Sequence, residues 1–159
     1  MKYANGPEDL PTPEQMSQMS GLEFMEAIRR GDFPGAPIAQ TLGFDIHEVS
    51  DGRVVFRGTP SFKVYNPIGT VHGGWFGTIL DSCMACAIQT TLPKGKAYTT
   101  LEYKVSIIRP LFERSGPVLA IGDVTHSGRR TGLATGQIVG ETDGKLYATG
   151  STTCIVMDF

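Results

Sequence analysis

The segment from Val71 to Leu92 constrains the fold most, because it is almost wholly apolar and contains no Lys, Arg or Glu. The Gly73-Gly74 pair stands near its start, and Pro93-Lys94-Gly95 ends it, which predicts one long helix over about 71–91. A helix that is apolar all round must be buried on most of its sides. The run is long enough to span a bilayer, but its glycines and Asp81 favour a buried central helix instead.

Two strand-like runs precede this helix and four follow it. Phe44–Val49 and Arg53–Thr59 are joined through Asp51-Gly52, a dipeptide typical of β-hairpins. We expect the four later runs, which are separated by turn residues, to form a meander. They are Ala97–Arg109, Val118–His126, Thr131–Glu141 and Leu146–Met157.

The first of these later runs alternates between apolar and polar residues. This period predicts one face made of Leu101, Tyr103, Val105 and Ile107. It predicts an opposite face made of Thr100, Glu102, Lys104 and Ser106.

One long apolar helix among six strands predicts an α+β fold, in which a curled antiparallel sheet wraps around the central helix. Small strand residues such as Gly122 and Gly136 would allow the helix to approach closely. Residues 1–40 form an N-terminal extension with a helix, since Thr12-Pro13-Glu14 opens a helical stretch, Ser20 and Glu23 have capping-box spacing and Gly31 closes it. The main domain then covers residues 41–159.

Composition excludes several classes of function. The net charge of −2 and scattered basic residues give no reason to expect nucleic acid as a partner. No secretory signal is recognisable at the start, so we expect a cytoplasmic protein. Cys83 and Cys86 spell C-x-x-C, but deep inside a helix they are better explained as core thiols than as a redox pair. A zinc-deaminase site is excluded because the required Glu after His72 is missing.

Asp81 is the only acid in the apolar run, and a buried acid is costly unless it is paired or used. Burial would raise its pKa toward the range of a general base. The Gly73-Gly74 pair offers bare backbone N–H groups at the positive end of the helix, which stabilises a developing oxyanion. Together these groups indicate acyl-transfer chemistry. The alternatives are a structural acid bonded across an interface and glycines that only permit close packing.

Gly73 and Asp81 are too far apart to act together within one chain. Eight residues correspond to about 12 Å along a helix, whereas both groups must come within roughly 3 Å of the same carbonyl. Two helices lying side by side in opposite directions could place Asp81 of one copy against Gly73 of the other. We therefore expect the site at a two-fold interface.

Five further residues carry polar or charged groups, and each has two interpretations. His72 is about 180° around the helix from Asp81, so we expect it to order the loop or contact the substrate. Asn66 either holds the same loop or binds a substrate carbonyl. Thr100 could position a water or be an ordinary strand residue. Arg129-Arg130 is either a charged hairpin tip or a contact for the phosphates of a nucleotide-bearing substrate.

The segment Gly69-Thr70-Val71-His72-Gly73-Gly74, with Asn66 before it and Asp81 nine residues after the histidine, resembles the hotdog-fold acyl-CoA thioesterases of the PaaI (phenylacetate-pathway) type. The later run ending Ile107-Ile108-Arg109-Pro110 also fits, and the resemblance covers roughly residues 40–157. It implies hydrolysis of an acyl-CoA thioester to a free acid and CoA, without a metal or redox cofactor. It also implies a homodimer that pairs into a homotetramer.

The resemblance assigns a role to each candidate residue. It implies that Asp81 is the general base or the nucleophile and that the Gly73 N–H polarises the thioester carbonyl. Asn66 and His72 match loop residues near that carbonyl. Thr100 stands where relatives often have a serine that orders the water. The residues expected to bind substrate are Gly74, Thr100, Arg129 and Arg130.

Two other functions are compatible with these residues. One is a hotdog-type hydratase or dehydratase, which would need His72 and Asp81 to pair across the interface. The other is a non-catalytic acyl-CoA-binding module that uses the same cleft. Whichever function holds, we hypothesise that one face of the N-terminal helix covers an edge of the acyl pocket, through Leu22, Phe24, Met25 and Ile28.

Overall fold

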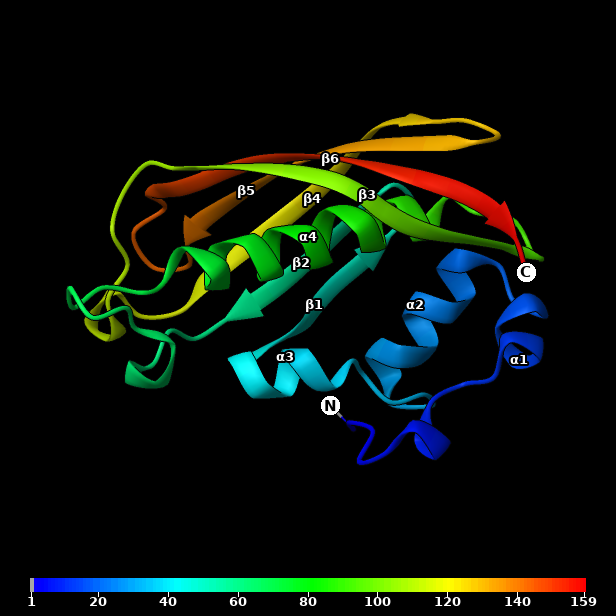
Figure 1. Ribbon diagram of the computed structural model, residues 1–159, viewed down its shortest axis with the longest axis horizontal. Coiled ribbons are helices and arrows are strands. Elements are labelled where there is room, and N and C mark those ends of the chain that lie inside the picture. Colours follow the sequence, from blue (N-terminus) through cyan, green and yellow to red (C-terminus); the bar gives the residue numbers. More distant parts are fainter. Residues whose placement is uncertain (1) are drawn as a thin grey trace.

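The computed structural model describes residues 2–159. The chain order is three short helices, a β-hairpin, one long helix and four strands (Figure 1). The helices are α1 (Pro13–Ser17), α2 (Gly21–Arg30), α3 (Pro37–Leu42) and α4 (Gly73–Thr90). The strands are β1 (Phe44–Ser50), β2 (Arg53–Gly58), β3 (Lys96–Ile107), β4 (Val118–Ser127), β5 (Thr131–Gly140) and β6 (Leu146–Asp158). Short 3₁₀ turns lie at Pro7–Asp9, Phe62–Val64 and Glu113–Ser115.

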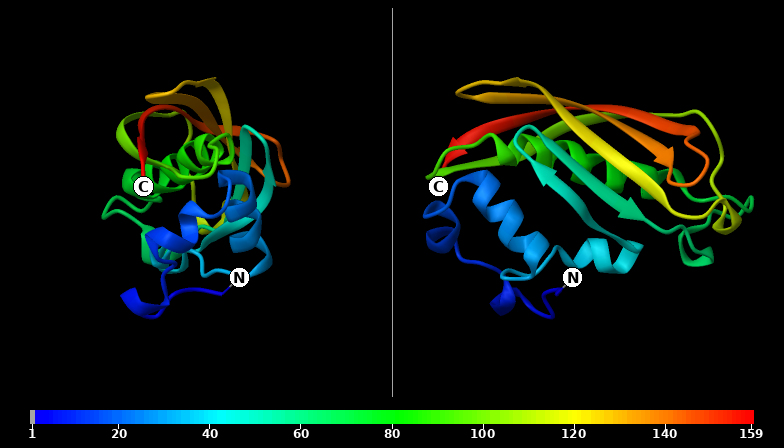
Figure 2. Two further views of the ribbon diagram at one scale, coloured as in Figure 1. Left: turned by 90° about the vertical axis from the view of Figure 1, so that its right-hand side faces the viewer. Right: turned by 180° about the vertical axis from the view of Figure 1, so that it is seen from behind.

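All six strands form one antiparallel sheet in the order β1-β2-β4-β5-β6-β3. The sheet curves around α4, while α1, α2 and α3 lie on the other side of that helix (Figures 1 and 2). This confirms the expected α+β architecture, the hairpin and the long central helix. No helix within residues 2–159 is both long and apolar enough to cross a membrane.

The expected four-strand meander is wrong for β3. Only β4, β5 and β6 follow one another in the sheet, whereas β3 pairs with β6 at the outer edge and β4 pairs with β2. A strand that runs directly beneath a helix needs small inward residues. Strand β4 provides Ala120 and Gly122 beneath α4, and both are buried. Strand β3 carries larger side chains and takes the edge position.

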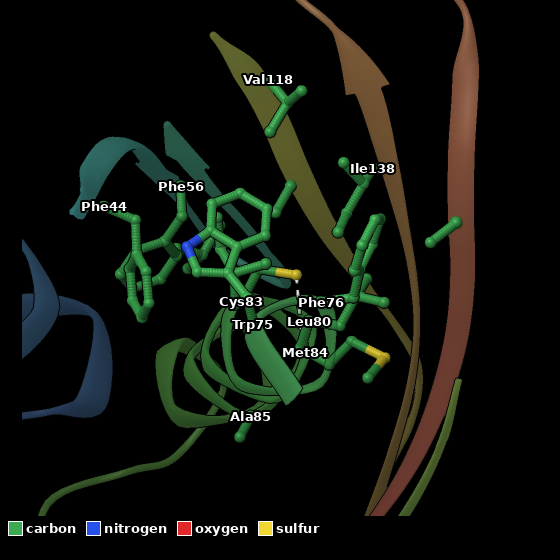
Figure 3. Packing of buried hydrophobic residues seen from close by; sticks show 14 of the residues in the cluster. Phe44, Phe56, Trp75, Phe76, Leu80, Cys83, Met84, Ala85, Val118 and Ile138 are labelled. Atoms are coloured by element: carbon green, nitrogen blue, oxygen red, sulfur yellow. Dashed lines mark hydrogen bonds between the residues drawn. The ribbon is translucent and has the colours of Figure 1, made fainter. Parts of the chain in front are cut away.

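Helix α4 packs almost directly on the backbone of β4. A Cβ atom added to Gly122 would lie 2.3 Å from the carbonyl oxygen of Cys83, so only glycine permits this contact. Around it, large side chains from α4 fill the space between helix and sheet (Figure 3). Among those with less than 2% exposure are Phe76, Ile79, Leu80, Met84 and Ile88. The predicted role of the strand glycines is confirmed at Gly122.

Residues 13–30 fold into two helices, α1 and α2, where one helical stretch was expected. Helix α2 begins with the predicted Ser20–Glu23 capping box and ends at Gly31, which has a left-handed backbone. It is docked against the end of α4, because the Gly21 N–H donates to the Leu92 carbonyl over 2.8 Å. Helix α3 was not predicted; its last residue, Leu42, accepts a hydrogen bond from the indole of Trp75.

The close contact at Gly122 predicts a large effect of one methyl group. We expect Gly122→Ala to lower the free energy of unfolding by about 2–3 kcal/mol, because the added Cβ meets backbone that cannot rotate away. Denaturant titration followed by circular dichroism measures this. The control is Thr135→Ala at an exposed position of β5, which should change stability by less than about 0.5 kcal/mol. Equal effects of the two substitutions would contradict the packing argument.

Candidate active site

A β-bulge in β3 decides which side chains face α4. Thr100 pairs with Cys154 and Glu102 pairs with Thr153, so Leu101 is an extra residue without a partner in the register. Beyond such an extra residue, each side chain points to the face of the strand opposite to the one that strict alternation predicts. Thr100 and Tyr103 therefore both point toward α4, as their contacts below show. The strict alternation predicted from the sequence, with these two residues on opposite faces, is wrong.

Asp81 lies half-buried on α4 and faces the edge strand. Its carboxylate oxygen Oδ1 accepts a hydrogen bond from the Thr100 hydroxyl over 3.0 Å. Burial raises the pKa of Asp81 above its ordinary value, and the bond from Thr100, which favours the charged form, opposes part of this rise. The result is an oriented carboxylate whose proton affinity is increased, as a general base requires.

Two more β3 side chains contact the same side of α4 toward its beginning. A Cβ atom on Gly77 would lie 3.2 Å from the hydroxyl of Tyr103, and one on Gly73 would lie 3.4 Å from Cδ1 of Ile107. Tyr103 and Ile107 are nevertheless 47% and 50% exposed. The edge strand β3 thus covers this side of α4.

Sequence reasoning did not place Tyr103 at the site. The signal that could have found it is the four-residue spacing of Gly73, Gly77 and Asp81, which puts two small residues and the acid along one side of the helix.

Gly73 lines a groove of about 280 Å³ at the start of α4. The groove is formed by the loop before the helix and by the end of β3 with the residues that follow it. Its lining residues are Asn66, Thr70, Val71, Gly73, Phe76, Ile107, Ile108, Arg109 and Pro110. We call this groove the Gly73 half-site, and Asp81 with Thr100 the Asp81 half-site. Neither Asp81 nor Thr100 lines the groove.

The backbone N–H of Gly73 is available to a ligand. As the first residue of α4 it has no earlier helical carbonyl to bond to, and within residues 2–159 it donates to no other group. A free N–H at the positive end of a helix is suited to hold a negatively charged oxygen. This is the property that the sequence analysis expected of Gly73.

Asn66 organises the loop in front of the helix. Its Oδ1 accepts hydrogen bonds from the N–H groups of Ile68 and Thr70, and its Nδ2 donates to the Thr70 hydroxyl over 2.9 Å. Gly69 completes the turn with a left-handed backbone, φ 87°. Of the two interpretations left open, these bonds support the loop role, while the side chain also borders the Gly73 half-site.

His72 is the N-cap of α4. Its Nδ1 accepts a hydrogen bond from the Gly74 N–H over 2.9 Å, so this donor is already occupied and Gly73 carries the free one. His72 and Gly74 border a different groove, formed with residues 63–65 and Trp75. His72 and Gly74 thus border a different groove from the Gly73 half-site, and the histidine side chain caps the helix.

Arg129 and Arg130 are exposed in the turn between β4 and β5. This turn lies by the end of α4, where the Thr91 and Ser127 hydroxyls form a hydrogen bond. The arginines are thus near the opposite end of the helix from Gly73. A second helix running antiparallel to α4 would bring its beginning toward them, which is the arrangement that a shared site needs.

The remaining nucleophiles are poorly suited to chemistry. Burial raises the pKa of Cys83 well above its ordinary value and that of Cys86 to about 12, so both thiols stay protonated. All three cysteines are free thiols. Within residues 2–159 no cluster of three or more His, Cys, Asp or Glu side chains could hold a metal ion.

Comparisons with known proteins agree with this fold and site. The sequence profile of the thioesterase superfamily matches residues 68–147. A Halobacterium salinarum protein named as a candidate esterase is 31% identical over 107 residues, which are 64% of this chain and 69% of that protein. The chain therefore belongs to the thioesterase superfamily.

Solved structures narrow the class. A thioesterase family protein from Silicibacter pomeroyi superposes with a TM-score of 0.75 at 25% identity, covering 84% of this chain and 98% of that one. A phenylacetic acid degradation-related protein from Ralstonia eutropha, described as a candidate thioesterase, gives a TM-score of 0.74 at 30% identity, covering 83% and 98%. The fold is the hotdog fold, and this protein is a PaaI-like thioester hydrolase.

The raised pKa of Asp81 predicts a pH-dependent cost to stability. Because its pKa is higher in the folded than in the unfolded chain, the contribution of Asp81 is fully present at low pH and is lost as the pH rises through the folded pKa. Asp81→Asn cannot ionise and keeps an acceptor for Thr100. We expect equal melting temperatures at acid pH, and a variant more stable by about 1–3 °C at mildly alkaline pH. A difference that does not change with pH would contradict the assignment.

Proposed function

We propose that this protein hydrolyses acyl-CoA thioesters to a free acid and CoA, at a site shared between two copies of the chain. The observation that carries the proposal is that the two reactive groups lie apart along one side of α4. A free Gly73 N–H stands at its beginning, and an oriented, half-buried Asp81 stands two turns later. Neither half-site holds both an oxyanion donor and a base, whereas a pair of antiparallel helices would hold both twice.

In this mechanism the Gly73 N–H of one copy donates a hydrogen bond to the thioester carbonyl oxygen at the positive end of its helix. Negative charge develops on that oxygen when the carbonyl carbon is attacked, so the interaction strengthens in the transition state. Asp81 of the other copy removes a proton from the attacking water, and the Thr100 hydroxyl orients this carboxylate. Collapse of the intermediate breaks the C–S bond, and the proton held by Asp81 passes to the departing CoA sulfur. Direct attack by the carboxylate, followed by hydrolysis of the mixed anhydride, uses the same two groups.

The exposed edge strand supports the pairing of two copies. Strand β3 has β6 on one side and no strand on the other within the described sheet, and exposed apolar side chains line this edge. An edge with such residues would ordinarily be a site of association. We propose a homodimer through α4 and β3 that pairs further into a homotetramer, with Arg129 and Arg130 of one copy holding CoA phosphates. A cytoplasmic location fits a CoA thioester substrate and stays a prediction.

A hydratase reaction is less well supported by the geometry. It needs a second proton-transferring group beside Asp81. His72 uses Nδ1 to accept the Gly74 N–H, which leaves only Nε2 for proton transfer, and the residue borders a different groove from Gly73. Release of free thiol from acyl-CoA, without a change in enoyl-CoA absorbance, separates the two reactions.

Two substitutions remove the two proposed groups with little change of shape. Asp81→Asn should lower kcat for thiol release by roughly 10²–10⁴-fold. Gly73→Pro should lower it by roughly 10²–10³-fold, because proline deletes the one N–H that the helix does not use. The backbone of His72, φ −64° and ψ 141°, is already the one that a following proline requires.

The matched control is Gly73→Ala, which keeps the N–H and adds only a methyl group in ordinary contact with Ile107. It should retain most of the activity. Thiol release by all the variants at the wild-type rate would remove both groups from the mechanism, and absence of thiol release by the wild-type protein on a broad acyl-CoA panel would overturn the proposed function itself.

A further inference from the structure

A second, larger internal space lies next to the Asp81 half-site. It is a cavity of about 330 Å³ between α4 and the N-terminal helices, with β1 and β2 as its far wall. From α2 it is lined by Phe24, Met25 and Ile28, three of the four residues that the sequence analysis placed beside an acyl pocket. Leu22, the fourth, does not line it.

The wall of this cavity is mostly apolar, and Ser82, Gln89 and Tyr98 are its polar side chains. No Asp, Glu, Lys or Arg side chain from residues 2–159 lines it. The two groups in the wall that could ionise stay neutral, since burial raises the pKa of Tyr98 well above its ordinary value and that of Cys86 to about 12. Since no charged side chain in the wall would compensate an ion, the cavity suits an uncharged and mainly apolar occupant.

The cavity lies close to the Asp81 half-site along both α4 and β3. Ser82, the residue after Asp81, lines it from α4. Tyr98 lines it from β3 and stands two residues before Thr100, on the same face of the strand. A thioester carbonyl held at Asp81 would therefore have the cavity of the same chain directly beside it.

We propose that this cavity holds the acyl group of the substrate, as an apolar chain or arylalkyl group of about six to ten carbon atoms, and that α2 sets its length. The proposal rests on the proposed thioesterase function and adds its substrate class. A methylene group, like a water molecule, occupies roughly 30 Å³, so the cavity accommodates about ten such groups. It also falls within the range of about 300–1,000 Å³ that is usual for small-molecule sites.

The way in which α2 docks on α4 explains why this cavity exists. The helix is fixed to α4 at Gly21, where a Cβ atom would lie 1.6 Å from the Gln89 carbonyl oxygen. Anchored there, α2 lies beside α4 (Figure 2). Its residues Phe24, Met25 and Ile28 line the space that remains between the two helices. The preferred shape and length of the acyl group then depend on the side chains of α2 and α3 that line the cavity.

The test measures kcat/KM for saturated acyl-CoAs from acetyl to dodecanoyl, with phenylacetyl-CoA as the aryl member. For the wild type we expect an increase of about fourfold per methylene until the cavity is full, followed by a decline. Ile28→Ala enlarges the cavity and should move the optimum two to three carbons longer. Ala39→Leu, which fills space from α3, should move it to shorter chains.

The matched control is Leu22→Ala, an equally half-buried aliphatic residue of α2 that does not face the cavity. It should keep the wild-type optimum. Opposite shifts from Ile28→Ala and Ala39→Leu cannot come from a general folding defect, which would lower activity on all chains alike. If thioesters are hydrolysed but the optimum stays unchanged in both variants, the acyl-pocket assignment is wrong while the thioesterase function stands.

Discussion

Helix α4 carries both the core and the candidate site, and its close contact with the sheet makes both possible. Glycine at position 122 lets the helix rest on the backbone of β4, so the strands on that side cover it completely. The opposite side is covered by α2 near the helix end, and the side with Gly73, Gly77 and Asp81 faces the edge strand β3. One helix thus holds a fully buried side and a side on which polar chemistry remains reachable.

The chemistry is distributed along that reachable side. The helix dipole and the free Gly73 N–H are at its beginning, whereas the carboxylate of Asp81 stands two turns later, in surroundings that raise its pKa. His72 contributes by capping the helix through Gly74, which leaves the neighbouring N–H free. The separation keeps the two groups from meeting within one chain, and this is why we place the active site between two chains.

Much of this arrangement could be predicted from the sequence because local rules dictate it. Glycines and a proline bound the apolar run, Asp51-Gly52 marks the hairpin, and an acid in an apolar helix marks a candidate site. The pairing of β3 with β6 and the bulge at Leu101 could not be predicted in the same way. Strand order depends on which strand has small residues beneath the helix, and one extra residue reverses the side-chain alternation. The face occupied by Tyr103 follows only from that register, and the cavity follows only from the way α2 docks at Gly21.

The measurement that tests the shared site most directly combines two inactive variants in one oligomer. Asp81→Asn and Gly73→Pro chains are co-expressed with different tags at equal amounts. Native mass spectrometry measures the fraction of dimers that contain one chain of each kind. In a mixed dimer, one of the two sites receives an intact Asp81 from one chain and an intact Gly73 from the other. With half of the dimers mixed and half of their sites intact, we predict recovery of roughly a quarter of wild-type turnover. Turnover that stays at the level of the two parent variants would contradict a site built from two chains.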